Sequence, residues 1–72
     1  MTEIKTRQIR LSKGFTTRQL AELSGISKSQ ITRIENNQQV PTIDTLCRIA
    51  EALGVPVEST YEYHHTENPQ SQ

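Results

Sequence analysis

The stretch LAELSGISKSQITRIENN, residues 20–37, predicts two short helices joined by a tight turn. Gly25 ends the first of them, because glycine readily adopts the left-handed conformation that closes a helix. Ser27, with Gln30 three residues later, has the capping-box form that begins the next helix. One helix therefore ends and the other begins within three residues, and Ile26 is expected to pack under the corner.

The second helix of this turn has an outward face made only of hydrogen-bond donors. Ile31 and Ile34 define the direction of the core when the residues are placed around a regular helix. A solvent-facing helix more usually mixes acidic with basic residues, whereas donors alone suit the phosphates and base edges of a DNA major groove. A solvated face that happens to lack acids is the alternative interpretation. We call these residues the donor face: Lys28, Ser29, Thr32, Arg33 and Asn36.

Another helix is predicted on the N-terminal side of this pair. Residues 3–13 contain no proline or glycine, and Gly14 follows them as a natural terminator. Residues 16–19, TTRQ, then have the capping-box form, in which a threonine oxygen accepts from the third helical N–H. The second helix of the chain begins there, and its apolar stripe is formed by Leu20, Ala21 and Leu23.

A fourth helix is predicted after the loop NNQQVP, residues 36–41. Asn37 in this loop can adopt the left-handed conformation that commonly ends a helix, and Thr42 can cap the next one. Asp44 lies near the positive end of that helix, and Gly54 ends it. Its apolar residues follow the cleanest amphipathic pattern in the chain: Ile43, Leu46, Ile49, Ala50 and Leu53.

The C-terminal stretch ESTYEYHH, residues 58–65, suits either a short strand or one turn of poor helix. Residues 66–72 have the composition of a flexible tail. We therefore expect a folded domain over residues 1–58, a possible dimerisation segment over 59–65, and the tail.

Length and composition indicate a single small domain of 72 residues. The single cysteine excludes an internal disulfide, and a reducing compartment is the simplest assumption. The N-terminal MTEIKTRQIR lacks the apolar run of a signal peptide, and no run is long enough to cross a membrane. A soluble, cytoplasmic protein is the expectation.

The charges are divided unevenly along a chain whose formal net charge is zero. Residues 1–40 hold seven Lys or Arg and three Glu, a net charge of +4. Residues 41–72 hold one Arg and five acids, a net charge of −4. A protein with one basic face can still attract a polyanion to it.

The run LAELSGISKSQITRIENNQQVPTIDTLCRIAEALGV, residues 20–55, resembles the phage repressor/Cro (XRE) family of helix-turn-helix DNA-binding domains. The resemblance covers about residues 5–57 and places the helix-turn-helix at about residues 17–36. It implies an all-α fold, a compact repressor-like domain of four to five helices, here with an irregular or short-strand C-terminal segment. The matching positions are Leu20-Ala21, Gly25-Ile26, Ile31, Ile34-Glu35-Asn36, Pro41-Thr42, Thr45-Leu46, Ile49-Ala50 and Leu53-Gly54-Val55.

The resemblance also implies a role for individual residues, with a recognition helix over residues 28–36 in the major groove of a palindromic operator. Arg33 is expected to read a base, because a guanidinium can pair bidentately with guanine. The implied base-contacting residues are Lys28, Ser29, Thr32 and Arg33. The implied phosphate-contacting residues, at a helix N-terminus and in the loop after the recognition helix, are Thr16, Thr17, Arg18, Asn36, Asn37 and Gln38.

A structural ion pair between Arg10 and Glu35 is implied in the same way, since such a pair occurs in some family members. An exposed pair that contributes little to stability is the alternative. Thr6 departs from the family pattern, because an apolar residue is usual at this point of the first helix.

The dimer contact of this family usually involves the region after the fourth helix, where ESTYEYHH replaces a leucine-rich fifth helix. We therefore expect the dimer contact here to use Val57, Tyr61 and Tyr63. A homodimer on double-stranded DNA is the expected assembly.

Histidine and cysteine are residue types that occur in metal and catalytic sites, and the chain has two histidines and one cysteine. His64 and His65 are adjacent, so their side chains point in different directions, and no acid or cysteine stands at ligand spacing beside them; a metal site is not expected. Cys47 follows an apolar residue of the fourth helix and is interpreted as a small residue in the core or at its edge.

The sequence thus favours a small transcriptional regulator of bacterial or phage origin, a repressor, located with the nucleoid. No cofactor, metal, membrane or small-molecule ligand is expected. The alternative is an antitoxin-like or adaptor module that binds a protein through its acidic C-terminal half. An enzyme is rejected, because the sequence has no phosphate-binding glycine loop, metal-ligand set or nucleophile–base pair.

Overall fold

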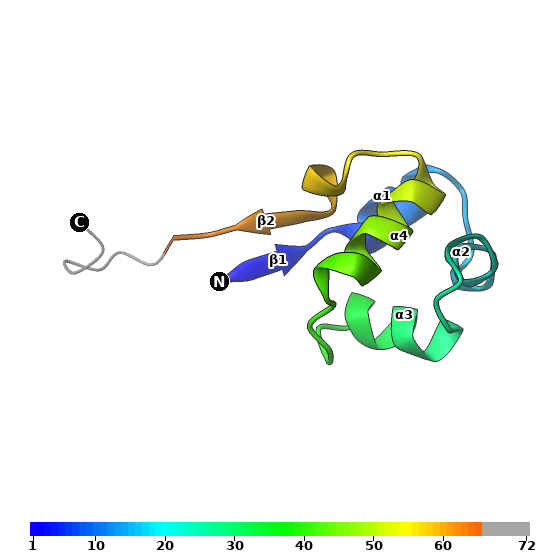
Figure 1. The fold of residues 1–72 in the computed structure, drawn as a ribbon, viewed down its shortest axis with the longest axis horizontal. Helices are drawn as coiled ribbons and strands as arrows, with labels where there is room; N and C mark the ends of the chain where they lie inside the picture. Colours follow the sequence, from blue (N-terminus) through cyan, green and yellow to red (C-terminus); the bar gives the residue numbers. More distant parts are fainter. Residues whose placement is uncertain (66–72) are drawn as a thin grey trace.

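The computed structural model describes residues 1–65, which form four α-helices and a two-stranded ribbon (Figure 1). The predicted flexible tail, residues 66–72, lies outside the described residues. The elements in chain order are β1 (Thr2–Ile4), α1 (Thr6–Ser12), α2 (Thr17–Ser24), α3 (Lys28–Glu35), α4 (Ile43–Leu53), the 3-10 helix η1 (Val57–Thr60) and β2 (Tyr61–Tyr63). The expected helical fold with a short-strand C-terminal segment is confirmed.

The core lies where α2, α3 and α4 meet. α4 contacts both α1 and α2, and α2 contacts α3. Ile26 is buried under the corner between α2 and α3, as predicted. The buried apolar cluster consists of Leu20, Ile26, Ile31, Ile34, Ile49 and Leu53.

Local capping signals set the helix boundaries. Thr16 makes both bonds of the predicted capping box, since its hydroxyl oxygen accepts from Gln19 N–H and its own N–H donates to the Gln19 side chain. Ser27 makes the first bond of its box, to the N–H of Gln30. Gly25 between them has a φ of 75°, so the backbone takes the left-handed turn that lets α3 leave the corner at once.

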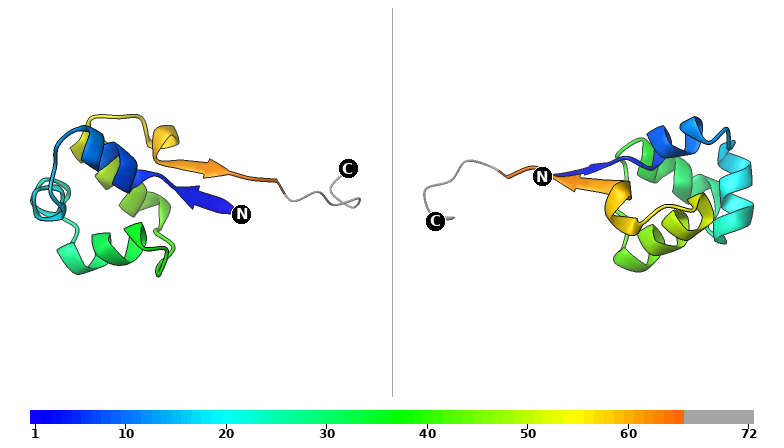
Figure 2. Two further views of the ribbon diagram at one scale, coloured as in Figure 1. Left: turned by 180° about the vertical axis from the view of Figure 1, so that it is seen from behind. Right: turned by 90° about the horizontal axis from the view of Figure 1, so that it is seen from above.

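The prediction of a helix over residues 3–13 is wrong at its start. The first residues instead form β1, which pairs antiparallel with β2 so that Glu3 lies opposite Glu62. Lys5 N–H donates to the carbonyl of Thr60 at 2.8 Å, and α1 begins only at Thr6. The strand forms because it hydrogen-bonds to β2. That partner lies almost sixty residues away in the sequence, so no local pattern reveals it. We call β1 and β2 together the ribbon; Figure 2 shows it extending away from the helices.

Three residues that were predicted to lie in the core or in an apolar stripe are exposed. Cys47 is exposed rather than part of the core, because it lies one residue beyond Leu46, away from the buried stripe of α4. Ile43 at the start of α4 is 74% exposed, since the core does not reach the first residue of this helix. Leu23 is exposed too, on the outer side of α2. None of the helices in residues 1–65 is long and apolar enough to span a membrane.

Candidate nucleic-acid interface

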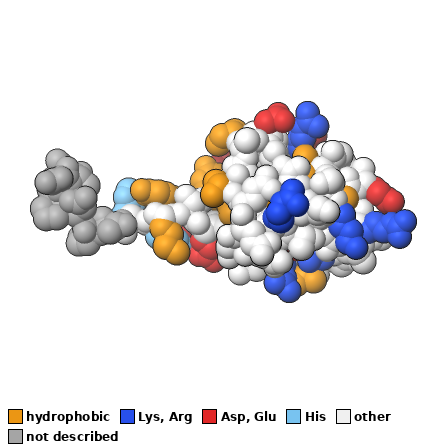
Figure 3. Space-filling view, turned by 90° about the horizontal axis from the view of Figure 1, so that it is seen from below, with side chains coloured by type: hydrophobic (Ala, Val, Ile, Leu, Met, Phe, Trp, Pro, Cys, Tyr) orange, Lys and Arg blue, Asp and Glu red, His pale blue; other side chains and the backbone are white. Residues whose placement is uncertain are grey.

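The donor face lies on the outside of α3. The helix is anchored from within by Ile31 and Ile34, whose side chains are 0% exposed. Lys28, Ser29, Thr32 and Arg33 are all exposed, and so is Asn36, which caps the helix C-terminus. Figure 3 shows the molecule from the side on which α3 lies in Figure 1, with separate Lys and Arg side chains over the surface and acidic side chains toward its edges.

Arg33 is held by a residue that the sequence analysis missed. Its Nε donates to Oε1 of Gln39 at 3.1 Å, from the loop that follows α3. Within residues 1–65 the two terminal nitrogens of this guanidinium make no hydrogen bond. Such a pair of N–H donors can pair with the acceptor edge of guanine. The signal in the sequence was Asn37, whose left-handed conformation (φ 60°) turns the chain back along α3.

The start of α2 offers backbone donors next to α3. The N–H of Thr16 is already used by the capping box, so this residue can contribute only its hydroxyl. Within residues 1–65, the N–H groups of Thr17 and Arg18 donate to no protein acceptor. Unpaired N–H groups at a helix N-terminus attract phosphate.

The loop after α3 offers side chains rather than backbone donors. The N–H of Asn37 donates to Ile34 and that of Gln38 to Arg33, and both bonds close the helix. The side chains of Asn36, Asn37 and Gln38 are exposed. The two groups of expected phosphate contacts thus stand at the start of α2 and at the end of α3.

Arg10 and Glu35 form a buried ion pair that fixes α3 against α1. Two hydrogen bonds join them, at 2.8 and 3.0 Å, and the two side chains are 9% and 6% exposed. The hydrogen bonds that Arg10 donates to the Glu35 carboxylate raise the pKa of Arg10 above its usual value. Arg10 also donates to the carbonyl of Phe15 at 2.8 Å. Loss of one partner of such a pair leaves a buried charge uncompensated, at a cost of about 3–5 kcal/mol.

Ion pairs neutralise part of the positive charge of residues 1–65. Lys5 pairs with Glu62, Arg10 with Glu35, and Arg48 with Asp44. The Lys and Arg residues of the described chain that make no such pair all lie in its first 40 residues, and they are Arg7, Lys13, Arg18, Lys28 and Arg33. Two of these cations, Lys28 and Arg33, belong to the donor face, and Arg18 lies in the first turn of α2.

No acid stands beside the histidines in the sequence, but the structure brings two acids close to His64. Pairing of β1 with β2 brings Glu3 to 3.0 Å from Nε2 of His64, with Glu62 close by. The ammonium group of Lys5 lies 2.6 Å from Glu62 and already neutralises this carboxylate. The group thus consists of two contacts at the ribbon: the ion pair of Lys5 with Glu62 and the hydrogen bond between His64 and Glu3.

The expected dimer residues are not equivalent in position. Tyr61 and Tyr63 belong to β2, where Tyr63 is exposed and Tyr61 half-buried. Val57 is half-buried in η1, between α4 and the ribbon.

The chain is similar to proteins of a helix-turn-helix family. The model of a helix-turn-helix family matches residues 7–59. The HTH-type transcriptional regulator SutR of Escherichia coli is 42% identical over 50 residues, which cover 69% of this chain and 28% of that protein. The regulator SinR of Bacillus subtilis is 37% identical over 65 residues, which cover 88% of this chain and 59% of that protein.

Solved structures share the fold. The N-terminal DNA binding domain of SinR from Bacillus subtilis has a TM-score of 0.71 at 36% identity, covering 75% of this chain and 80% of that domain. The restriction-modification controller protein C.AhdI from Aeromonas hydrophila has a TM-score of 0.72 at 28% identity, covering 74% of this chain and 80% of that one. The chain spans 28% to 59% of the length of the regulators SutR and SinR that it matches.

Proposed function

This chain belongs to the Cro/C1-type helix-turn-helix family, a family of non-enzymatic DNA-binding proteins, and we propose that it is a transcriptional regulator that binds double-stranded DNA in a sequence-specific manner. The observation that carries the proposal is the division of α3 into two faces. Ile31 and Ile34 fix the helix in the core, while the donor face is exposed and free of acids. An anchored helix with such a face suits insertion into a major groove.

In this proposal Arg33 reads a guanine with its terminal nitrogens, and Gln39 holds the guanidinium in position. Lys28, Ser29 and Thr32 contact neighbouring bases or phosphates. The start of α2 and the side chains after α3 bind phosphates on either side, which fixes the helix in the groove. Sequence preference then comes mainly from Arg33, and affinity comes from the whole set.

The protein acts as a homodimer on a near-palindromic site, because one short recognition helix contacts only a few base pairs. The two half-site centres lie about one helical turn, or about 10 base pairs, apart. Bound at a promoter, such a dimer occupies the DNA and acts as a repressor.

The alternative of an adaptor that uses its acidic half receives less support. Two of the acids in that half are neutralised, Asp44 by Arg48 and Glu62 by Lys5. Fewer carboxylates are then left to attract a basic partner.

The proposal is tested by selecting bound duplexes from a random pool at a defined salt concentration. A near-palindromic motif with the spacing given above should be enriched. Its affinity should fall steeply with salt, because phosphate contacts release counterions. A pool without an enriched motif after repeated selection would contradict sequence-specific binding.

A further inference from the structure

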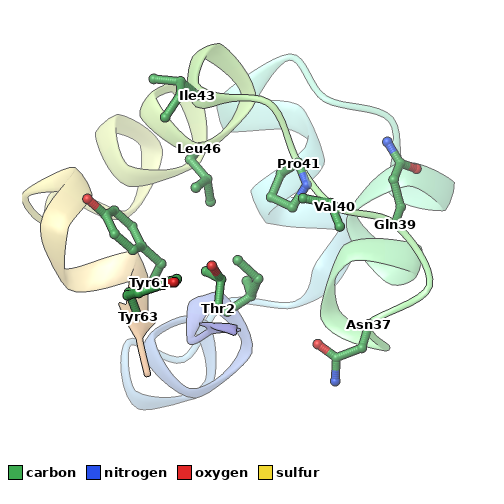
Figure 4. Close-up of a pocket in the computed structure, with 10 residues that line it drawn as sticks. Thr2, Asn37, Gln39, Val40, Pro41, Ile43, Leu46, Tyr61 and Tyr63 are labelled. Carbon is green, nitrogen blue, oxygen red and sulfur yellow. The ribbon is translucent and has the colours of Figure 1, made fainter. Parts of the chain in front are cut away.

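The ribbon has two faces with different side chains, because successive residues of a strand point to opposite sides. One face lines a groove of about 550 Å³, which it shares with exposed apolar residues such as Val40 and Ile43. Figure 4 shows Tyr61 on the wall of this groove. The ribbon residues that line it are Thr2, Ile4, Tyr61 and Tyr63. We call the other side of the ribbon the polar face, and its residues are Glu3, Lys5, Glu62 and His64.

Three side chains of the polar face bring metal-ligating atoms close together. Glu3 stands directly opposite Glu62 in the register of the two strands. Nε2 of His64 lies 3.0 Å from Oε1 of Glu3. One ligand atom from each of the three residues lies within 4.8 Å of the ligand atoms of the other two. The residues come from opposite ends of the described chain, so their spacing in the sequence gives no sign of this cluster.

The backbone of the ribbon holds all three residues of the cluster in place. The N–H of His64 donates to the carbonyl of Met1 at 2.7 Å, and the N-terminal ammonium of Met1 donates to the carbonyl of His64 at 2.8 Å. The pairing of β1 with β2 therefore continues to His64, one residue beyond the end of β2. An ion bound by the cluster needs to order only the three side chains, because their backbones already belong to one hydrogen-bonded ladder.

The charges of the polar face favour a cation between the two carboxylates. Like charges at directly opposite positions destabilise a pair of strands, and Glu3 and Glu62 occupy such positions. Lys5 neutralises Glu62, but within residues 1–65 no Lys or Arg pairs with Glu3. The side chains of Lys5 and Glu62 are 33% and 50% exposed, and an exposed ion pair contributes little to stability. A divalent ion can therefore displace the ammonium group of Lys5 and neutralise both carboxylates.

The donor atoms of the cluster select the kind of ion. An imidazole nitrogen with two carboxylate oxygens is a set that suits Zn²⁺, and a water molecule can take the fourth position. Ca²⁺ and Mg²⁺ prefer a larger set made of oxygen ligands alone. Bonds of about 2.0–2.2 Å in a tetrahedral zinc site place neighbouring ligand atoms about 3.4 Å apart. Small rotations of three half-exposed side chains reach that arrangement from the observed distances.

We propose that Glu3, Glu62 and His64 bind a divalent metal ion, for which Zn²⁺ is the best fit, and that this ion joins β1 to β2. Each strand has only three residues, and a two-stranded ribbon of this kind is marginally stable on its own. The bound ion therefore stabilises the ribbon. The site contains no residue of the donor face and lies on the part of the molecule that extends away from the helices (Figure 2), so this inference does not rest on the proposed function.

The direct test is calorimetric titration of the full chain with Zn²⁺, together with thermal unfolding in the presence and absence of the ion. The wild type should bind one ion per chain, and its Tm should rise because the ion binds the folded ribbon. His64→Gln should raise the dissociation constant for Zn²⁺ about tenfold or more and abolish the rise in Tm. The matched control is His65→Gln, because the ring of His65 packs edge-on against Tyr63, with 5.1 Å between the ring centroids; this variant should bind Zn²⁺ like the wild type.

Three further variants separate this site from other exposed ligands. Lys5→Met removes the ammonium group that competes for Glu62, so it should bind Zn²⁺ more tightly than the wild type. Glu3→Gln removes one ligand and also the repulsion with Glu62, so it should weaken Zn²⁺ binding without lowering the Tm of the ion-free protein. Cys47→Ser removes the exposed thiol of α4 and should leave Zn²⁺ binding unchanged.

Several results would overturn the inference. One is a wild type that binds no Zn²⁺, and another is wild-type affinity in His64→Gln or Glu3→Gln. An equal loss of binding in His65→Gln or Cys47→Ser would place the ion elsewhere. Lys5→Met that binds no more tightly than the wild type would contradict the involvement of Glu62. An equal rise in Tm with Mg²⁺ at the same concentration would show a general effect of divalent charge and refute a zinc site.

Discussion

The side chain of Thr6 is buried at the start of α1, and its hydroxyl oxygen has no hydrogen-bond partner within residues 1–65. The sequence already marked this position, since an apolar residue is usual there in the family that the chain resembles. Thr60 is equally buried, but its hydroxyl donates to the carbonyl of Val57 at 2.6 Å. Two buried threonines thus differ in whether their polar atom is satisfied.

Thr6→Val should therefore stabilise the protein. Removal of an unsatisfied buried hydroxyl should raise the free energy of unfolding by about 1 kcal/mol, which corresponds to about 4–8 °C in Tm for a domain of this size. Thr60→Val is the matched control and should lower the Tm, because it leaves the Val57 carbonyl without its donor. Thermal unfolding followed by circular dichroism measures both, and a lower Tm for Thr6→Val would contradict this account of the site.

At the scale of elements, the boundaries of α2 and the starts of α3 and α4 could be predicted because their signals are local. Thr16, Ser27 and Thr42 each accept from a backbone N–H three residues ahead, and Gly25 has the expected left-handed conformation. The ribbon could not be predicted from such signals. Its two strands lie at opposite ends of the described chain, and the N-terminal one has polar residues that also suit a helix.

In the candidate site, too, some features could be predicted from local sequence and others could not. The donor face followed from helical periodicity around two isoleucines, so its exposure was predictable. The contact between Arg33 and Gln39 depends on the path of a loop, and the exposure of Val40 and Ile43 depends on where the core ends. These features became visible only in three dimensions.

The ribbon should respond to pH through Lys5 and Glu62. The hydrogen bond with Lys5 lowers the pKa of Glu62 below its ordinary value of 4.5, and Glu62 raises the pKa of Lys5 above 10.5. Because the pKa of Glu62 is lower in the folded state, its contribution is present above pH 4.5 and is lost as the pH falls through the lowered value. The contribution of Lys5 is also stabilising but has the opposite pH dependence: it is present below pH 10.5 and is lost as the pH rises through the raised pKa of Lys5.

Urea unfolding of the wild type and Lys5→Met over a series of pH values measures this effect. The wild type should be slightly more stable at neutral pH, and the difference should close as Glu62 becomes protonated. Lys13→Met removes a lysine that makes no ion pair in residues 1–65 and should show no such closing. A stability difference between wild type and Lys5→Met that is constant down to acid pH would refute the role of the pair.

At the scale of the whole molecule, a small core anchors α3 through Ile31 and Ile34. The buried ion pair of Arg10 and Glu35 joins α3 to α1, and the donor face of α3 is exposed. The ribbon, which replaces a further helix, provides an apolar groove at the end of α3.

The central claim, that the donor face reads DNA sequence, is tested most directly by Arg33→Ala on the selected site. The variant should lose about 1–3 kcal/mol of binding free energy there and relax the preference at one position in each half-site. Its non-specific binding should fall much less, and its Tm should stay close to that of the wild type, because the side chain points outward. As the comparison, Lys28→Ala should weaken binding to all sequences alike and reduce the salt dependence by about one unit of slope per monomer. Full wild-type specificity in Arg33→Ala would contradict the claim and leave the donors as a merely solvated face.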